Sequence, residues 1–113
     1  MTTITRSEEI AGKDDQIVRV VGVYAVENLG RYRIVSEQID GTRIQSNKLA
    51  YVELEGGGTI RLGARPDAEH EMAGKLVAVT GRLKEEWPPR QAEHVAQPNP
   101  APALIEISAV EPR

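Results

Sequence analysis

The sequence of 113 residues contains no cysteine, no phenylalanine and only two histidines. Without cysteine the chain can form no disulfide, no thiolate metal site and no cysteine nucleophile. Its stability must rest on packing alone, which fits a reducing compartment, and we expect a cytoplasmic protein. No apolar run approaches the ~20 residues of a membrane span. The polar first 15 residues lack the apolar stretch of a signal peptide, so we expect no membrane partner.

Recognisable catalytic and metal-binding motifs are also missing. His70 lies between two glutamates without a second histidine at helical spacing, so the zinc-protease pattern fails, and a site shared with His94 would require the fold to bring the two together. None of the four serines occupies a Gly-x-Ser-x-Gly elbow. The three glycines at 56–58 precede neither a helix nor Gly-Lys-Ser/Thr, which favours a turn over a phosphate loop. We therefore expect no enzyme, no metal and no cofactor.

The chain has fewer basic residues (14) than acidic ones (17). The formal net charge is −3, and aromatic residues make up only 4% of the chain. A strong nucleic-acid binder usually carries a basic excess, because neutralising phosphates supplies much of its affinity. Hydrophobic residues at 40% and charged residues at 27% are ordinary for a globular protein. The length predicts one domain, which we place at residues 16–113 behind a polar N-terminal tail at 1–15.

Two stretches give clear strand patterns. Residues 17–26 are dense in β-branched side chains, with a glycine, Gly22, at a position where a long strand could bend. Residues 50–55 and 59–62 alternate around the glycine turn and predict a hairpin. Its inward side chains are expected to be Val52, Leu54, Ile60 and Leu62.

The second half of the chain predicts a helix and two further strands. Residues 66–74 begin with Pro66 and end with Gly74, as short helices do, with Ala68 and Met72 four residues apart on one face. Strands are expected at 75–83 and 104–110, the latter with Ile105 and Ile107 inward. Five of the seven prolines fall in 84–103, which predicts an extended loop.

The order of these elements resembles the OB-fold. It begins with a strand and a long, partly hairpin-like connection at 27–49, with a hairpin-turn signal at Asp40 and Gly41. A hairpin, a short helix, a strand, the long loop at 84–103 and a last strand then follow one another. Gly22 and Gly81 lie where barrel strands would bend. The resemblance implies an all-β fold with one short helix. The expected architecture is a five-stranded antiparallel OB-type barrel, with the helix between strands 3 and 4 plugging one end. Another Greek-key barrel or an SH3-like barrel remains an alternative.

The same resemblance implies where a ligand would bind. OB-type domains use the face of strands 2 and 3, flanked by the loops that correspond here to 27–49 and 84–103. Both loops exceed the length typical of plain connections, which favours a function. The candidate ligand-binding residues are Tyr51, Arg61, Tyr32, Arg33, Arg43, Lys48, Trp87 and Arg90.

Two functions are compatible with this surface. The composition favours a non-catalytic binding or adaptor module that engages a protein partner through its barrel rim and loops. The alternative is single-stranded nucleic acid or an oligosaccharide on the strand 2/3 face, although Glu53, Glu85 and Glu86 would repel phosphates. Tyr51 could equally pack on the sheet, and Trp87 could anchor the loop. Residues 98–102 favour polyproline II, as a recognition segment or a stiff loop.

Overall fold

A computed structural model describes residues 1–88 and 100–113 of the chain. The described residues are mostly β and contain eight strands and two short 3₁₀ helices. The helices are η1 (Ser7–Glu9) and η2 (Asp67–Met72). The strands are β1 (Thr2–Ile4), β2 (Ile17–Asn28), β3 (Ile34–Glu37), β4 (Arg43–Ser46), β5 (Lys48–Glu53), β6 (Thr59–Gly63), β7 (Leu76–Trp87) and β8 (Ala101–Pro112). In this part of the chain no helix is long and apolar enough to cross a membrane.

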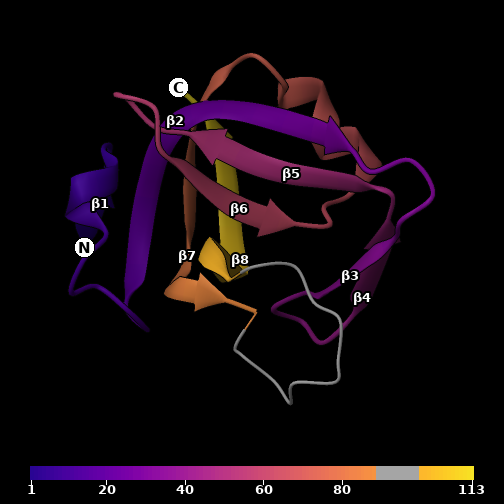
Figure 1. Ribbon diagram of the computed structural model, residues 1–113, viewed down its shortest axis with the longest axis horizontal. Helices are drawn as coiled ribbons and strands as arrows, with labels where there is room; N and C mark the ends of the chain where they lie inside the picture. The colour runs from indigo at the N-terminus through magenta and orange to yellow at the C-terminus, as the bar shows by residue number, and fades with distance from the viewer. Residues whose placement is uncertain (89–99) are drawn as a thin grey trace.

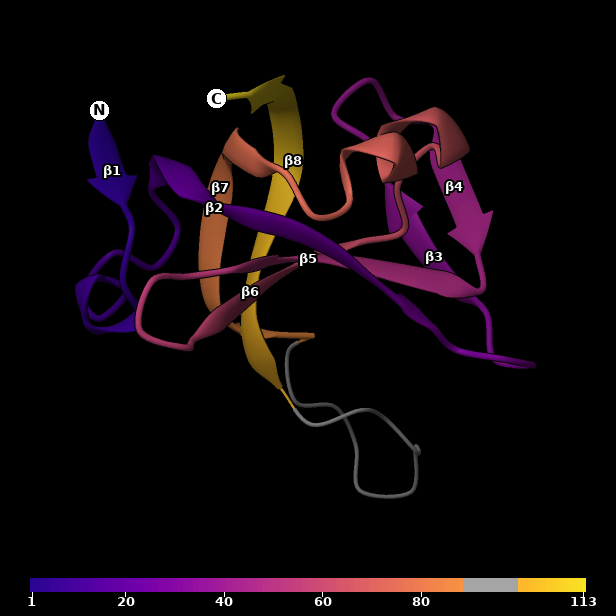
Figure 2. The same ribbon diagram turned by 90° about the horizontal axis from the view of Figure 1, so that it is seen from above.

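Six strands form one curved sheet in the order β1-β2-β5-β6-β8-β7, and β7 also pairs with β2 (Figure 1). The hairpin of β3 and β4 forms a separate two-stranded sheet beside it (Figure 2). The five predicted strands correspond to β2, β5, β6, β7 and β8. The predicted count and the purely antiparallel arrangement are wrong, because β1, β3 and β4 are additional strands and both the β1–β2 and the β6–β8 pairings are parallel.

Gly22 lies where β2 changes partners. Residues 17–23 of β2 pair with β7, and residues 23–28 pair with β5. A Cβ atom on Gly22 would lie 2.6 Å from Cγ1 of Val52 and would overlap the carbonyl oxygen of Glu53. Only glycine therefore lets β5 approach the middle of β2 this closely.

The core is formed by aliphatic side chains from every strand of the large sheet, together with Tyr24. The predicted inward residues of β5 and β6 and the residue between them, Val52, Leu54, Ile60 and Leu62, are all buried. In β8 the prediction is only half right. Leu104 and Ile107 are buried, whereas Ile105 is only half-buried. The left-handed φ of 48° at Glu106 and a register shift opposite β7 interrupt the alternation of side chains.

The N-terminal tail at residues 1–15, which is polar as predicted, packs against the sheet through β1 and Ile10. β1 pairs with residues 18–20 of β2, and Ile4 is completely buried. Ile10 is buried as well, and Glu55 N donates to the carbonyl of Thr5 at 3.0 Å. Two isolated isoleucines therefore supply apolar contacts with the sheet, although the composition of residues 1–15 is polar overall.

The predicted helix at 66–74 is present as the 3₁₀ helix η2 between β6 and β7. The predicted inward pair is wrong, because Ala68 is exposed and only Met72 packs against the core. In a 3₁₀ helix residues three apart share a face. Glu69, three residues before Met72, therefore takes the inward position predicted for Ala68.

Both predicted long loops are shorter than expected. The segment 27–49 begins in β2, contains the β3–β4 hairpin and ends in β5, with the predicted turn at Gly41. In 84–103, β7 continues to Trp87 and β8 begins at Ala101, whereas residues 89–99 lie outside the described part of the chain. Pro102 is tolerated in β8 because the register shifts between Lys84 and Trp87, where a ladder hydrogen bond is not required.

Candidate binding pocket

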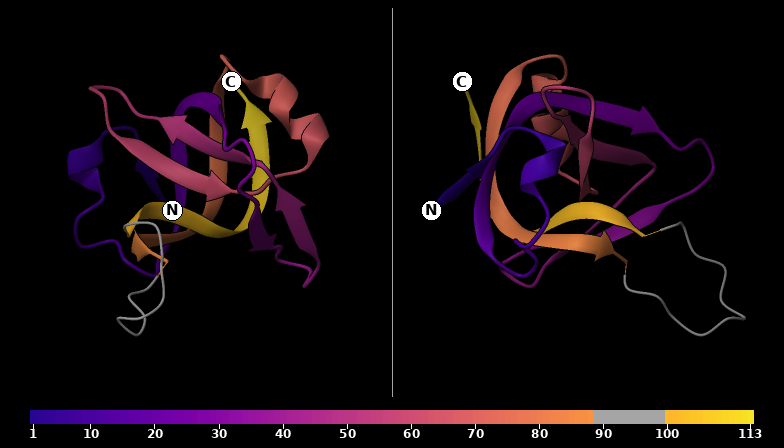
Figure 3. Two further views of the ribbon diagram at one scale, coloured as in Figure 1. Left: turned by 45° about the vertical axis from the view of Figure 1, so that its right-hand side comes forward. Right: turned by 60° about the vertical axis from the view of Figure 1, so that its left-hand side comes forward.

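A pocket of about 610 Å³ lies between the β3–β4 hairpin and the large sheet. Its walls come from the hairpin and its turn, from the end of β6, from β8 and from the end of β7 with Pro88. Figure 3 shows the β3–β4 hairpin beside the large sheet from two further directions. The volume falls within the range of ordinary ligand sites.

Much of the lining is apolar and open to solvent. On the hairpin, Val35 is 58% exposed and Ile39 is 62% exposed, and on the opposite wall Trp87 is 37% exposed. Ile34 and Ile105, both half-buried, also line the pocket. Exposed apolar side chains gathered around a concave surface mark interaction sites more often than single exposed residues do.

The charged residues in the lining are balanced in sign. Glu37 and Glu106 are acidic, and Arg61 and Arg65 are basic. Glu106 accepts a 2.8 Å hydrogen bond from Nε of Arg82, and Arg65 is bound to Glu69. The described lining residues therefore present no excess of positive charge that would attract a phosphate backbone.

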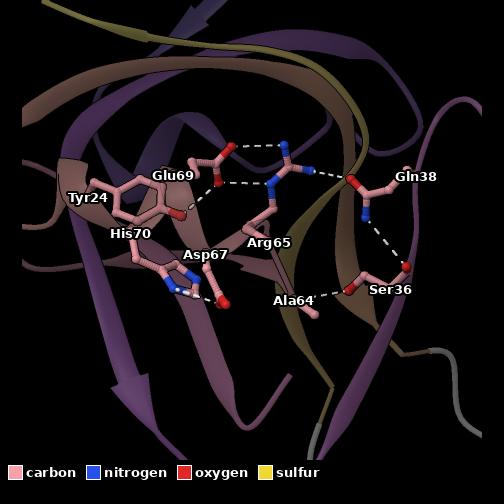
Figure 4. A network of polar contacts seen from close by, with 8 residues as sticks. All are labelled: Tyr24, Ser36, Gln38, Ala64, Arg65, Asp67, Glu69 and His70. Carbon is pink, nitrogen blue, oxygen red and sulfur yellow. Dashed lines mark hydrogen bonds and ion pairs between the residues drawn. The ribbon is translucent and has the colours of Figure 1, made fainter. Parts of the chain in front are cut away.

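The hairpin is attached to the end of β6 by two side chains of its first strand and turn (Figure 4). The backbone N of Ala64 donates to Oγ of Ser36 at 2.8 Å. Nη1 of Arg65 donates to Oε1 of Gln38, also at 2.8 Å. A Cβ on Gly63 would overlap Oγ of Ser36, so glycine is needed for this close approach as well as for its φ of 76°.

Behind these contacts lies a mostly buried polar network. Arg65 donates from Nε and Nη2 to the two oxygens of Glu69, both at 2.9 Å, in a bidentate pair whose side chains are about one-tenth exposed. Oε2 of Glu69 also accepts a 2.7 Å hydrogen bond from the Tyr24 hydroxyl (Figure 4). Burial, together with the hydrogen bond to Glu69, raises the pKa of Tyr24 far above its ordinary value.

His70 lies beside this network without joining it. Its Nδ1 is 3.8 Å from an oxygen of Asp67, and its buried Nε2 has no hydrogen-bond partner among the residues that the structure describes. Among the described residues no group of three or more histidine, aspartate or glutamate side chains is placed to hold a metal ion. His94, the other histidine considered from the sequence, is outside the described residues.

The structure brings only some of the predicted site residues together. Tyr51 of β5 lies directly opposite Arg61 of β6, and both are half-buried. Arg61 and Trp87 line the pocket. Four others are exposed and do not line it: Tyr32, Arg33, Arg43 and Lys48. Arg90 lies outside the described residues.

The apolar lining residues of the hairpin were missed by sequence reasoning. Ile34, Val35 and Ile39 stand among polar residues and show no alternation. One signal could have indicated an exposed apolar residue here. Ile39 directly precedes the turn residues Asp40 and Gly41, and a large aliphatic side chain at an exposed turn is not buried in the core.

Comparison of the chain with models of protein families, with curated proteins and with solved structures found no match in any of the three. Function must therefore be inferred from the residues of this chain and their placement.

Proposed function

We propose that the domain is an OB-type barrel acting as a non-catalytic binding or adaptor module. The pairing order supports this fold, because β2, β5, β6, β8 and β7 follow one another and β7 pairs again with β2. Along the chain the 3₁₀ helix η2 lies between β6 and β7, the third and fourth of these five strands in sequence order, as the helix of an OB-fold would. The lack of cysteine supports a cytoplasmic location.

The ligand is an apolar segment of a protein partner, bound in the pocket between the hairpin and Trp87. The observation that carries this proposal is the exposure of Val35, Ile39 and Trp87 around one concave surface. Such side chains gain free energy when a partner removes them from water, at about 25 cal/mol per Å² of apolar area. The balanced charges of the lining favour a peptide over a polyanion.

A second candidate is single-stranded nucleic acid or an oligosaccharide on the outer face of β5 and β6. Its support is the cross-strand pair of Tyr51 and Arg61, an aromatic and a basic residue at directly opposite positions of β5 and β6. Base stacking on such residues is worth ~1–3 kcal/mol per base. Glu53, exposed beside Tyr51, weakens this candidate because it would repel phosphates.

Selection from a phage-displayed library of random peptides tests the leading proposal. We expect the wild-type chain to enrich peptides rich in apolar residues. The variant Val35→Asp places a carboxylate in the pocket lining and should weaken these peptides by about tenfold or more. The matched control is Ile17→Asp, because Ile17 is also an exposed aliphatic residue on a strand but does not line the pocket.

Several outcomes would count against the proposal. Peptides that bind Val35→Asp as tightly as the wild type would place the binding surface elsewhere. Failure to enrich any peptide, combined with binding of a single-stranded oligonucleotide that weakens steeply with salt, would favour the second candidate. Circular dichroism of both variants shows whether the substitutions leave the fold intact.

A further inference from the structure

We infer that Ser36 and Gln38 are positioning residues that hold the β3–β4 hairpin at a fixed distance from the large sheet and so set the width of the pocket. This inference rests on the proposed function for its biological meaning, but the attachment itself is a property of the free protein. It assigns a role to two polar side chains of the hairpin, which line the pocket beside the apolar Ile34, Val35 and Ile39.

The hairpin has a fixed base. Leu29 N donates to the carbonyl of Asn47 at 2.7 Å, and Nδ2 of Asn47 donates to the carbonyl of Gly30 at 3.2 Å. These bonds join the residues that enter and leave the hairpin. Beyond them, β3 and β4 pair with each other and with no strand of the large sheet among the described residues. The part of the hairpin that faces the pocket is therefore placed by side-chain contacts.

Ser36 and Gln38 supply these contacts from one side of the hairpin. Residues two apart in an extended chain point to the same side. Ser36 binds the backbone of Ala64, and Gln38 binds Arg65, so both attach to consecutive residues after β6. Ser36, Gln38 and Arg65 also line the pocket, so a change in their separation changes its shape.

Arg65 is a rigid anchor for this attachment. Two of its nitrogens are held by Glu69, and Glu69 is held in turn by the buried Tyr24. A guanidinium fixed in this way loses little further conformational entropy when it binds Gln38. The chain of contacts runs from the core strand β2 through η2 to the hairpin (Figure 4).

The test uses Gln38→Ala, which removes the acceptor for Arg65, and Ser36→Ala, which removes the acceptor for Ala64. Gln38→Glu keeps an acceptor oxygen for Arg65 and should therefore leave the hairpin attached. Gln45→Ala is the control, because Gln45 is an exposed glutamine in the same hairpin, opposite Val35. Two quantities are measured on the free, full-length protein: hydrogen exchange of the hairpin amides and acrylamide quenching of Trp87. Trp87 is the single tryptophan and lines the pocket.

We expect Gln38→Ala and Ser36→Ala to speed amide exchange across β3 and β4 by about tenfold, as loss of a hydrogen bond to a charged or buried group would do. Quenching of Trp87 should rise with it, because the facing wall moves away. Gln38→Glu and Gln45→Ala should behave as the wild type.

Unchanged exchange and quenching in both alanine variants would overturn the inference. So would equal changes in Gln45→Ala, because that variant leaves the attachment intact. These measurements need no ligand, so they can fail while peptide binding succeeds. Conversely, suppose that the alanine variants show the expected faster exchange while the wild-type chain selects no peptide. That result would contradict the proposed function and leave this inference standing.

Discussion

The hydroxyl of Tyr24 donates a 2.7 Å hydrogen bond to Oε2 of Glu69, which joins the middle of β2 to the 3₁₀ helix η2. Because Glu69 also holds Arg65, this bond connects the core to the residue on which the hairpin is anchored. The lining residue Arg65 is thus held in place by contacts that reach the buried core of the sheet.

Replacing Tyr24 by Phe should lower the free energy of unfolding by about 1.5–3 kcal/mol, the usual cost of losing a hydrogen bond to a charged group. The aromatic ring and its packing are kept, so urea denaturation should report the bond alone. Tyr32→Phe is the control, because Tyr32 is 80% exposed, and it should change the midpoint little. Equal effects of the two variants would mean that the buried network does not stabilise the fold.

Replacing Gly22 by Ala should destabilise the protein by about 3 kcal/mol or more, because the added methyl group overlaps backbone of β5 that cannot move independently. Gly41→Ala is a matched control. Gly41 has a left-handed φ of 89°, but no described atom lies within 4 Å of the position that a Cβ would take, so only backbone strain of about 1–2 kcal/mol is expected there. Thermal or urea unfolding compares the two. A smaller loss for Gly22→Ala than for Gly41→Ala would contradict the close packing of β2 on β5.

Replacing His70 by Leu should leave stability unchanged or raise it by about 1 kcal/mol. No residue in the described part of the chain forms a hydrogen bond with the buried Nε2, and an apolar side chain of similar size removes that unsatisfied atom. Urea denaturation measures the change. A clear loss of stability would show that the imidazole makes a contact that the fold requires.

Glu9 should make unfolding depend on pH in the acid range. Its Oε1 accepts hydrogen bonds from Thr5 N, Thr5 Oγ1 and Arg6 N, and the bond from Thr5 N contributes most to lowering the pKa of Glu9 below its ordinary value of 4.5. A depressed folded-state pKa stabilises the protein above the unfolded-state value, and this stability is lost as the pH falls through the folded-state value.

Glu9→Gln should therefore flatten the dependence of unfolding free energy on pH below about pH 4.5. The exposed Glu111, replaced by Gln, is the control and should leave more of this dependence in place. Denaturant titrations at a series of acid pH values provide the measurement. Identical pH profiles for wild type and Glu9→Gln would show that η1 does not depend on this carboxylate.

The β5–β6 hairpin could be predicted residue by residue, because its inward side chains alternate and three glycines mark the turn. A special role for Gly22 in the middle of β2 was also predictable, although the β5 residues that require a glycine there were not. The N-terminal strand could not be predicted, because Ile4 and Ile10 stand alone among polar residues and their burial depends on a pairing with β2 that is distant in sequence.

Part of the pocket was predictable and part was not. The segments 27–49 and 84–103 were expected on the same rim, and residues of both, from Ile34 to Trp87, line one pocket. Its apolar character was hidden for two reasons. Short strands such as β3 give no periodic signal, and the irregular backbone at Glu106 turns Ile105 out of the core in a way that simple alternation cannot anticipate.

Fluorescence titration of Trp87, the only tryptophan in the chain, tests the central claim most directly. A peptide from the selection and a single-stranded oligonucleotide are each titrated at about 50 mM and about 200 mM salt. The account predicts a saturable change in Trp87 emission with the peptide, nearly the same at both salt concentrations and absent in Val35→Asp. A peptide that binds without changing Trp87 emission, or an oligonucleotide that changes it and is released by salt, would contradict it.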